Sequence, residues 1–278
     1  MSKTASIEKY LRQSALPHIW CPGCGNGILL AAILRAIDKL QMDQKKTVIV
    51  SGIGCSSRAS GYMNFNTVHT AHGRALTFAT GIKLANPELN VLVITGDGDC
   101  TAIGGNHFIH AARRNIDLTT IIFNNSIYGM TGGQYSPLTP IASKATTAPF
   151  GHIERPFDVA ALATASGATY VARGTAYHAN LLTDLIVKGI ENKGFSVIDA
   201  ITQCPISFGR KNKMGSAAKM LEWQRDNAVP VQAAAKMSPE DLTAKFLIGE
   251  LHHSSAPEYT AEYDKLIARV QGKKGGAN

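Results

Sequence analysis

The sequence of 278 residues lacks any long run of apolar residues, which excludes a membrane-spanning helix. Such a helix needs about 18 consecutive apolar residues. The densest runs here, residues 27–34 and 91–95, end at Arg35 and at Gly96-Asp97. The first 13 residues mix Lys, Glu and Arg with apolar residues, so we expect no signal peptide. These features predict a cytoplasmic protein that does not enter a membrane.

The sequence also lacks an excess of acidic residues. Its 28 Lys and Arg exceed its 20 Asp and Glu, which gives a net charge of +8. A basic balance can indicate nucleic acid, an acidic partner protein or an anionic ligand. The basic clusters are short, as at Lys45-Lys46 and Arg113-Arg114, and no recognition motif accompanies them. We therefore expect no nucleic-acid partner.

Two nucleotide-binding fingerprints are missing. The glycine pairs at 52/54 and 96/98 lack the third glycine of the dinucleotide motif, because Ser57 and Thr101 stand at its position. The sequence contains no Gly-Lys-Ser/Thr phosphate loop either. A nicotinamide dehydrogenase and a P-loop enzyme are both disfavoured.

The sequence does contain short apolar runs that alternate with segments of helical period. Strands are predicted at residues 47–53, 90–95, 118–123 and 195–200, with another near Val171. Helices are predicted between the first cysteine pair and about residue 40, and at residues 74–84, 105–114, 160–166 and 179–190. This alternation predicts an α/β fold, a mainly parallel sheet with helices on both faces. Functional residues then belong in the loops at the strand carboxyl ends.

Two segments depart from this pattern. Residues 129–149 are rich in Gly, Ser, Pro and Thr, and we expect them to be too polar for the core. From residue 210 the pattern weakens, with helical pieces predicted around residues 217–224, 239–247 and 259–270. We predict a cofactor-binding region, residues 1–209, and a helical C-terminal extension, residues 210–278.

Polar residues follow two neighbouring predicted strands. Asp97 lies in Gly96-Asp97-Gly98, and Asn125 comes 28 positions later, after one helix and one strand. Such a unit places the second loop beside the first. Carboxylate and amide oxygens suit Mg²⁺, which can also hold phosphate oxygens. The two glycines let backbone N–H groups approach a diphosphate, and the following helix offers its amino end.

The five cysteines do not form the even framework of a secreted disulfide protein. Cys21-Pro-Gly-Cys24 brings two thiolates into one turn, while Cys55 and Cys204 follow predicted strands. Four thiolates, the last followed by proline, can hold a [4Fe–4S] cluster or a structural zinc ion. Spacing alone leaves both possibilities open. Cys100 has no partner in either set, and we expect it to be buried.

The Asp97 and Asn125 pair resembles the thiamine diphosphate motif, and residues 96–137 resemble the β subunits of 2-oxoacid:ferredoxin oxidoreductases. The resemblance extends over roughly residues 15–210, through WCPGCGNG, SGIGCSS, HTAHGRALTFATGIKLANP and QCP. It implies a thiamine diphosphate-binding fold with Mg²⁺ on Asp97, Asn125 and the carbonyl of Ile127. It implies one [4Fe–4S] cluster on the four cysteines other than Cys100. The implied contacts to thiamine diphosphate are Ile53, Gly54, Cys55, Ser56, His72, Gly73, Arg74, Gly98, Asp99, Gly129 and Met130.

The resemblance also implies an activity. The family carries out oxidative decarboxylation of a 2-oxoacid with coenzyme A as acyl acceptor, and the electrons pass through the cluster to ferredoxin. The glutamate that activates the aminopyrimidine comes from an α subunit, so we assign no catalytic residue here and expect the chain alone to be inactive. A dimer of heterodimers is implied, and the helical faces at residues 75–85 and 102–112 are candidates for burial against the partner. Cys55 and Ser56 belong to both constellations, so the cluster and the thiamine ring should be close neighbours.

The substrate is predicted from residues 129–134, GMTGGQ, which resemble the 2-oxoglutarate members and imply succinyl-coenzyme A and CO₂ as products. Pyruvate or a branched-chain 2-oxoacid is the alternative substrate. Alternative functions are a thiamine diphosphate decarboxylase or lyase with structural zinc, and a non-catalytic electron-transfer subunit. Arg210, Lys211, Lys213 and Lys219 follow a proposed cluster ligand, with no Asp or Glu between residues 204 and 221. We predict that they form the docking surface for an acidic ferredoxin.

Overall fold

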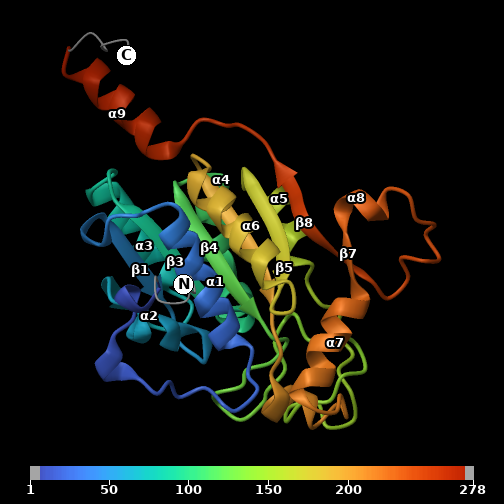
Figure 1. The fold of residues 1–278 in the computed structure, drawn as a ribbon. Helices are drawn as coiled ribbons and strands as arrows, with labels where there is room; N and C mark the ends of the chain where they lie inside the picture. The colour runs from blue at the N-terminus through green and yellow to red at the C-terminus, as the bar shows by residue number, and fades with distance from the viewer. Residues whose placement is uncertain (1–6, 273–278) are drawn as a thin grey trace.

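The chain folds around one eight-stranded sheet (Figure 1). The structure, a computed structural model, describes residues 7–272; residues 1–6 and 273–278, the outer ends of the two predicted regions, lie outside the described residues. The strands are β1 Thr47–Ser51, β2 Asn66–His69, β3 Asn90–Gly96, β4 Leu118–Asn124, β5 Tyr170–Thr175, β6 Phe195–Ile201, β7 Ala228–Pro230 and β8 Phe246–His253. Their order across the sheet is β2-β1-β3-β4-β6-β5-β8-β7.

The first six strands of this order, β2, β1, β3, β4, β6 and β5, are parallel to one another, as the alternation of strands and helices predicts. The central strands are buried along nearly their whole length, which explains their uniformly apolar runs. Gly96 pairs with Phe123, and Asn124 pairs with Ile201. The loops after β3, β4 and β6 therefore leave the sheet at one edge, where functional residues are expected.

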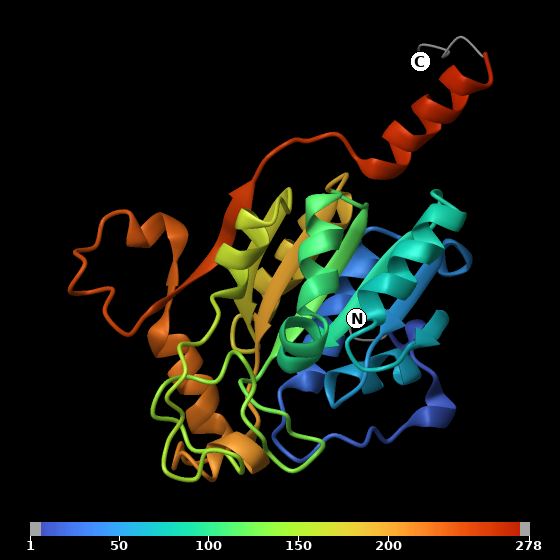
Figure 2. The same ribbon diagram turned by 180° about the vertical axis from the view of Figure 1, so that it is seen from behind.

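Helices cover both faces of the sheet. Figure 1 shows α1, Asn26–Lys39, and α6, Ala179–Glu191, in front of it. Figure 2 shows the opposite face under α3, Ala75–Ala85, α4, Gly105–Arg113, and α5, Val159–Ala165. Two apolar cores result, one beneath each helical layer. Apart from the short helix α2, Ala59–Tyr62, and the strand β2, the sequence predicts these elements up to residue 209 with small boundary differences.

The prediction that residues 129–149 are too polar for the core is wrong for part of that segment. Ser136 and Thr139 are fully buried, and Leu138 and Ala145 are nearly so. Leu138 packs into the core on the α3–α5 side of the sheet. The two hydroxyl groups form hydrogen bonds inside the protein, so their burial leaves no polar atom unsatisfied.

The C-terminal extension is less helical than predicted. Helices α7, Ala217–Asn227, and α9, Tyr259–Val270, confirm two of the three expected pieces, and a short helix α8, Val231–Ala234, lies between them. The helix predicted at residues 239–247 is wrong, because β8 begins at Phe246 and pairs antiparallel with β5. The hydrogen bonds that the edge of β5 offers outweigh the weak helical pattern. The extension thereby enlarges the sheet of the first region.

None of the helices between residues 7 and 272 is long and apolar enough to cross a membrane.

Candidate functional site

A small cavity of about 40 Å³ lies at the carboxyl ends of β1, β3 and β4. We call it the diphosphate cavity. Three loops form its walls, and each loop follows one of these strands, as the parallel topology requires. The predicted magnesium and cofactor residues that line it are Ile53, Gly54, Cys55, Ser56, Asp97, Gly98, Asp99, Asn125, Ile127, Gly129 and Met130.

Asp97 and Asn125 present oxygens that suit a cation. Asp97 is almost completely buried, and burial raises the pKa of its carboxyl to about 7, although the Ser136 hydroxyl 2.6 Å away acts in the opposite direction. The buried Oδ1 of Asn125 accepts no hydrogen bond from the described residues. A buried carboxylate and a buried acceptor without a donor are stabilised together by a cation. These two residues fit Mg²⁺.

Asp99 also lines the cavity, but its oxygens already have protein donors. Its Oδ1 accepts the backbone N–H of Gly73 at 2.7 Å and lies 2.6 Å from the Nδ1 of His72. Its Oδ2 accepts the hydroxyl of Thr95 at 2.7 Å, and the N–H of Ile53 approaches Oδ1 at 3.4 Å. Asp99 therefore ties the loops after β1 and β2 to the end of β3.

Three of the predicted thiamine diphosphate contacts, His72, Gly73 and Arg74, do not line the diphosphate cavity; the N–H of Gly73 donates to Asp99, which does. The guanidinium of Arg74 donates to the carbonyl groups of Gly73 and Ile103, at 3.4 and 3.3 Å. A contact of these three residues with thiamine diphosphate stays a prediction.

Close packing explains why one motif position is glycine. The Tyr128 hydroxyl donates to the carbonyl of Gly98 at 3.0 Å, and a Cβ on Gly98 would overlap the tyrosine ring. The ring closes the cavity on the side of β4. Nothing in the sequence near Tyr128 signals this role, because its partner lies 30 positions away.

A second cavity of about 240 Å³ is lined by the four predicted cluster cysteines, Cys21, Cys24, Cys55 and Cys204. We call it the cysteine cavity. All four are free thiols, and a Cβ on Gly129 would lie 3.5 and 3.6 Å from the sulfurs of Cys55 and Cys204. Burial raises the pKa of Cys24 to about 12 and of Cys55 to about 11, and the neighbouring thiols act in the same direction. Cys100 is buried outside this cavity, as predicted.

The cysteine cavity encloses a space larger than one ion. Among residues 7–272, no three His, Cys, Asp or Glu side chains form a group that could hold a metal ion. The remaining walls are mostly apolar, from Ile19, Trp20, Met130, Pro205 and Ile206. A volume of about 240 Å³ bordered by four thiols suits a multi-atom cluster better than a zinc ion, whose four sulfurs would converge at about 2.3 Å from it.

Helix α7 of the C-terminal extension supports the loop that contains Cys21 and Cys24. The side chain of Gln203 donates to the carbonyl of Gly23 at 3.1 Å, and Gln224 of α7 donates to Gln203 at 3.2 Å. On the other side, the indole N–H of Trp20 donates to the carbonyl of Cys55 at 2.7 Å. Both glutamines are buried. Sequence reasoning missed them, since no local pattern marks a contact between residues 180 positions apart.

The two cavities share part of their walls. Cys55, Asn125, Gly129 and Met130 line both of them, so a group in one lies next to a group in the other. The sequence predicts this adjacency from Cys55 and Ser56; Cys55 lies in both walls, whereas Ser56 lines the diphosphate cavity alone.

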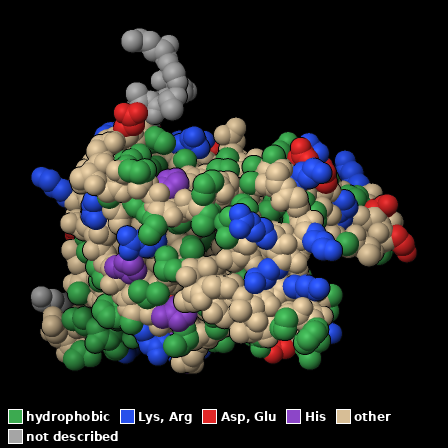
Figure 3. Space-filling model, turned by 90° about the horizontal axis from the view of Figure 1, so that it is seen from below, with side chains coloured by type: hydrophobic (Ala, Val, Ile, Leu, Met, Phe, Trp, Pro, Cys, Tyr) green, Lys and Arg blue, Asp and Glu red, His purple; other side chains and the backbone are tan. Residues whose placement is uncertain are grey.

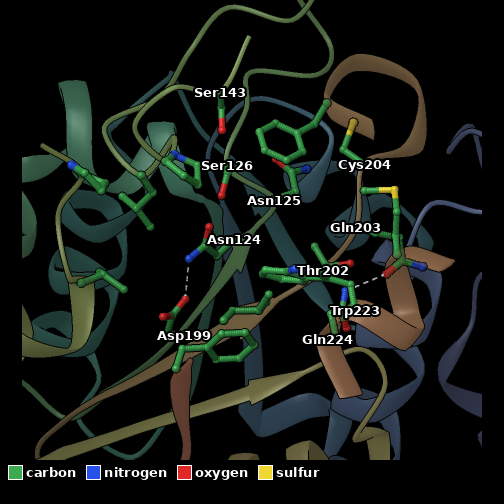
Figure 4. A pocket seen from close by; sticks show the side chains of 18 of the residues that line it. Asn124, Asn125, Ser126, Ser143, Asp199, Thr202, Gln203, Cys204, Trp223 and Gln224 are labelled. Carbon is green, nitrogen blue, oxygen red and sulfur yellow. Dashed lines mark hydrogen bonds between the residues drawn. The ribbon is translucent and has the colours of Figure 1, made fainter. Parts of the chain in front are cut away.

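Asn124 and Asn125 also line a third and larger cavity, of about 520 Å³ (Figure 4). At its base, Asn124 donates to Asp199 at 2.9 Å, and Arg173 donates to Asp199 and to Asp158 at 2.7 and 2.6 Å. The side chains of Arg173 and Asp199 are mostly buried in β5 and β6. Sequence reasoning missed this group, because Arg173 and Asp199 lie within strands rather than in the loops after them, and Asp158 is the residue before α5.

The predicted docking residues, Arg210, Lys211, Lys213 and Lys219, are all exposed. Lys144 belongs to the same surface, because its backbone N–H and carbonyl both bind the side chain of Asn212. Figure 3 views the molecule from below and shows several Lys and Arg side chains there, with few acidic side chains among them.

Residues 52–200 match the family model of the thiamine pyrophosphate enzyme, C-terminal TPP binding domain. The chain is 52% identical to the 2-oxoglutarate synthase subunit KorB of Methanothermobacter marburgensis, over 96% of this chain and 93% of that protein. It is 51% identical to the subunit of the same name in Methanocaldococcus jannaschii, over 95% of this chain and 98% of that protein.

A solved structure agrees with these relatives. The 2-oxoglutarate:ferredoxin oxidoreductase from Magnetococcus marinus, with 2-oxoglutarate, coenzyme A and succinyl-CoA bound, superimposes with a TM-score of 0.86 at 34% identity. The match covers 99% of this chain and 94% of that chain. Residues 52–200, which match the thiamine pyrophosphate-binding domain, include every residue that lines the diphosphate cavity. Thiamine diphosphate is therefore the cofactor of this fold. The chain belongs to the family of thiamine diphosphate-dependent 2-oxoacid:ferredoxin oxidoreductase β subunits, among its 2-oxoglutarate synthase members.

Proposed function

We propose that this chain is the subunit of a 2-oxoglutarate:ferredoxin oxidoreductase that holds thiamine diphosphate, Mg²⁺ and one [4Fe–4S] cluster. The reaction converts 2-oxoglutarate and coenzyme A into succinyl-coenzyme A and CO₂, and the cluster would supply the route by which the two electrons reach two ferredoxins. The observation that carries this proposal is the wall shared by the diphosphate and cysteine cavities.

The chain's own residues have binding and positioning roles. Thiamine diphosphate supplies the electron sink for loss of CO₂ from a 2-oxoacid. Asp97, Asn125 and the carbonyl of Ile127 would hold a magnesium ion, whose charge would neutralise the diphosphate of the cofactor. Gly54 and Gly98 let the backbone approach the cofactor. The four cysteines would hold the cluster, whose loading releases the protons that the buried thiols carry.

A second subunit completes the active site in this proposal. No glutamate among the described residues lines the diphosphate, cysteine or third cavity, which agrees with an activating glutamate from an α subunit. Large apolar side chains are exposed on and beside α3 and α4, including Phe78, Ile103 and Ile109. These are the helical faces that the sequence predicts as the partner's contact. We propose a dimer of such heterodimers in the cytoplasm.

Cofactor analysis of anaerobically purified enzyme tests the proposal. We expect about four iron and four sulfide per chain, a broad brown absorption and one bound thiamine diphosphate. Stoichiometric zinc without iron or sulfide would instead support a thiamine diphosphate lyase with a structural metal.

Substrate choice requires a separate measurement. With ferredoxin and coenzyme A present, kcat/KM should be highest for 2-oxoglutarate among 2-oxoglutarate, pyruvate and a branched-chain 2-oxoacid. A preference for pyruvate would retain the family and correct the substrate.

A further inference from the structure

A buried polar segment lies directly behind the proposed magnesium site. Residues 136–139, Ser-Pro-Leu-Thr, follow the loop that separates the two cavities, and we call them the SPLT segment. Ser136 and Thr139 have no exposed surface. Buried hydroxyl groups need fixed partners, and those partners show what the segment holds in place.

The hydroxyl of Ser136 is oriented toward Asp97. Its oxygen accepts the backbone N–H of Leu138 at 3.3 Å and lies 2.6 Å from Asp97 Oδ2. Because a carboxylate can only accept, the serine proton points to Asp97. The Ser136 hydroxyl thus fixes the orientation of the Asp97 carboxylate, which presents its oxygens at the diphosphate cavity.

Thr139 holds the other half of the site. Its hydroxyl oxygen accepts the N–H of Ser136 at 2.8 Å, and its proton goes to the carbonyl of Ser126 at 2.6 Å. Ser126 has φ of 60°, in the left-handed region that side chains rarely adopt. It stands between Asn125 and Ile127, so its turn sets the direction of both proposed ligands.

We propose that the SPLT segment is a latch that positions both halves of the magnesium site, with Ser136 and Thr139 as positioning residues. The claim rests on the proposed function, because it presumes a cation at Asp97 and Asn125. The latch fixes the ligands of the β3 loop and of the β4 loop relative to each other before the cation arrives. Preorganised ligands bind more tightly, and removal of an outer hydrogen bond commonly weakens metal binding by 10–100-fold.

The experiment measures Mg²⁺ dependence of cofactor binding rather than turnover. Thiamine diphosphate is removed from the assembled enzyme, and its rebinding is followed by calorimetry at increasing MgCl₂ concentrations. The variants are Ser136→Ala and Thr139→Val. The matched control is Thr119→Val, which removes a buried threonine hydroxyl bonded to the carbonyl of Gly189 at the opposite end of β4. Thermal unfolding of each cofactor-free variant is recorded alongside.

We expect Ser136→Ala to raise the half-saturating Mg²⁺ concentration by about 10–100-fold, and Thr139→Val by about fivefold. The Thr119→Val control should stay within about twofold of wild type at a similar loss of thermal stability. Excess Mg²⁺ should restore cofactor binding to both latch variants.

Unchanged Mg²⁺ dependence in folded Ser136→Ala and Thr139→Val would overturn the latch while leaving the metal site intact. If Ser136→Ala fails to fold, Thr139→Val decides by the same criterion. An equal loss in Thr119→Val would show general destabilisation and would also overturn the latch. If the wild-type enzyme binds thiamine diphosphate without any Mg²⁺ dependence, the proposed metal site itself fails, and the latch with it.

Discussion

The diphosphate cavity and the cysteine cavity share walls but are built differently. The diphosphate cavity is small, its walls are partly polar and partly apolar, and hydrogen bonds from the loops after β1 and β2 and from β3 itself fix Asp99 in it. The cysteine cavity is about six times larger and mostly apolar, and its Cys21–Cys24 loop is supported by Gln203 and by Gln224 of α7. The side chains of the diphosphate cavity are thus fixed by residues of the cofactor-binding region itself. The cysteine cavity depends on the C-terminal extension.

The first prediction separates the two sites by removing a thiol. Cys24→Ser should abolish or nearly abolish the brown absorption of the cluster, because one of four thiolates is lost. Cofactor binding in the diphosphate cavity should persist, since Cys24 does not line it. Iron content and visible absorption of anaerobic protein measure the effect. Cys100→Ser is the matched control and should retain its iron; an iron-free Cys100→Ser protein would refute the ligand assignment.

The second prediction removes the carboxylate of Asp97 from the diphosphate cavity and leaves the cysteine cavity unchanged. Asp97→Ala should lower the affinity for thiamine diphosphate by about 100-fold or more, because the cation that neutralises the diphosphate loses its charged ligand. The cluster absorption should remain, since Asp97 does not line the cysteine cavity. The amount of cofactor retained through gel filtration, measured as thiochrome fluorescence after oxidation, provides the readout. Full retention would mean that the site lies elsewhere.

Several features of the fold and of the two cavities could be predicted from the sequence. Uniformly apolar runs such as residues 118–123 predict central parallel strands, and that topology brings Asp97 and Asn125 to one cavity. Strand β2 was missed because four half-exposed residues, Asn66–His69, have no apolar run. Strand β8 was missed because it pairs with β5, whose residues lie 76 to 83 positions earlier in the chain.

The supports of the two sites were beyond sequence reasoning for the same physical reason. Ser136 lies 39 positions from Asp97, and Gln203 lies 180 positions from Gly23. Serine and glutamine occur on every protein surface, so neither residue type indicates a buried partner. Only the fold shows that these side chains are buried and which groups they bind.

The dependence of the cysteine cavity on α7 can be tested through Gln224. Gln224→Leu leaves the Oε1 of Gln203 and the N–H of Tyr177 without their hydrogen-bond partner, and each loss should cost about 1–3 kcal/mol of folding stability. We expect faster loss of iron to a chelator and no change in thiamine diphosphate affinity. Gln232→Leu on exposed α8 is the matched control. Equal iron release by the two variants would show that α7 does not support the cluster.

The smallest expected effect concerns the basic surface beside the cysteine cavity. Replacing Arg210, Lys211 and Lys213 by Gln should raise the KM for ferredoxin about three- to tenfold at low salt and less at high salt. Reduction of a small uncharged dye should stay unchanged. The control replaces Lys45 and Lys46, which directly precede β1, by Gln. An equal loss with dye and ferredoxin would point to damage at the cluster, and weaker coenzyme A binding alone would assign the surface to that ligand's phosphates.

The central claim is that electrons pass directly from the diphosphate cavity's cofactor to a cluster in the adjoining cavity. Electron paramagnetic resonance of the assembled enzyme, frozen after 2-oxoglutarate is added without ferredoxin, tests it most directly. We expect a reduced [4Fe–4S] signal in wild type, its loss in Cys24→Ser through loss of the cluster, and its loss in Asp97→Ala with the cluster still present. A wild-type enzyme that holds both groups, releases CO₂ from 2-oxoglutarate and leaves the cluster oxidised would contradict it.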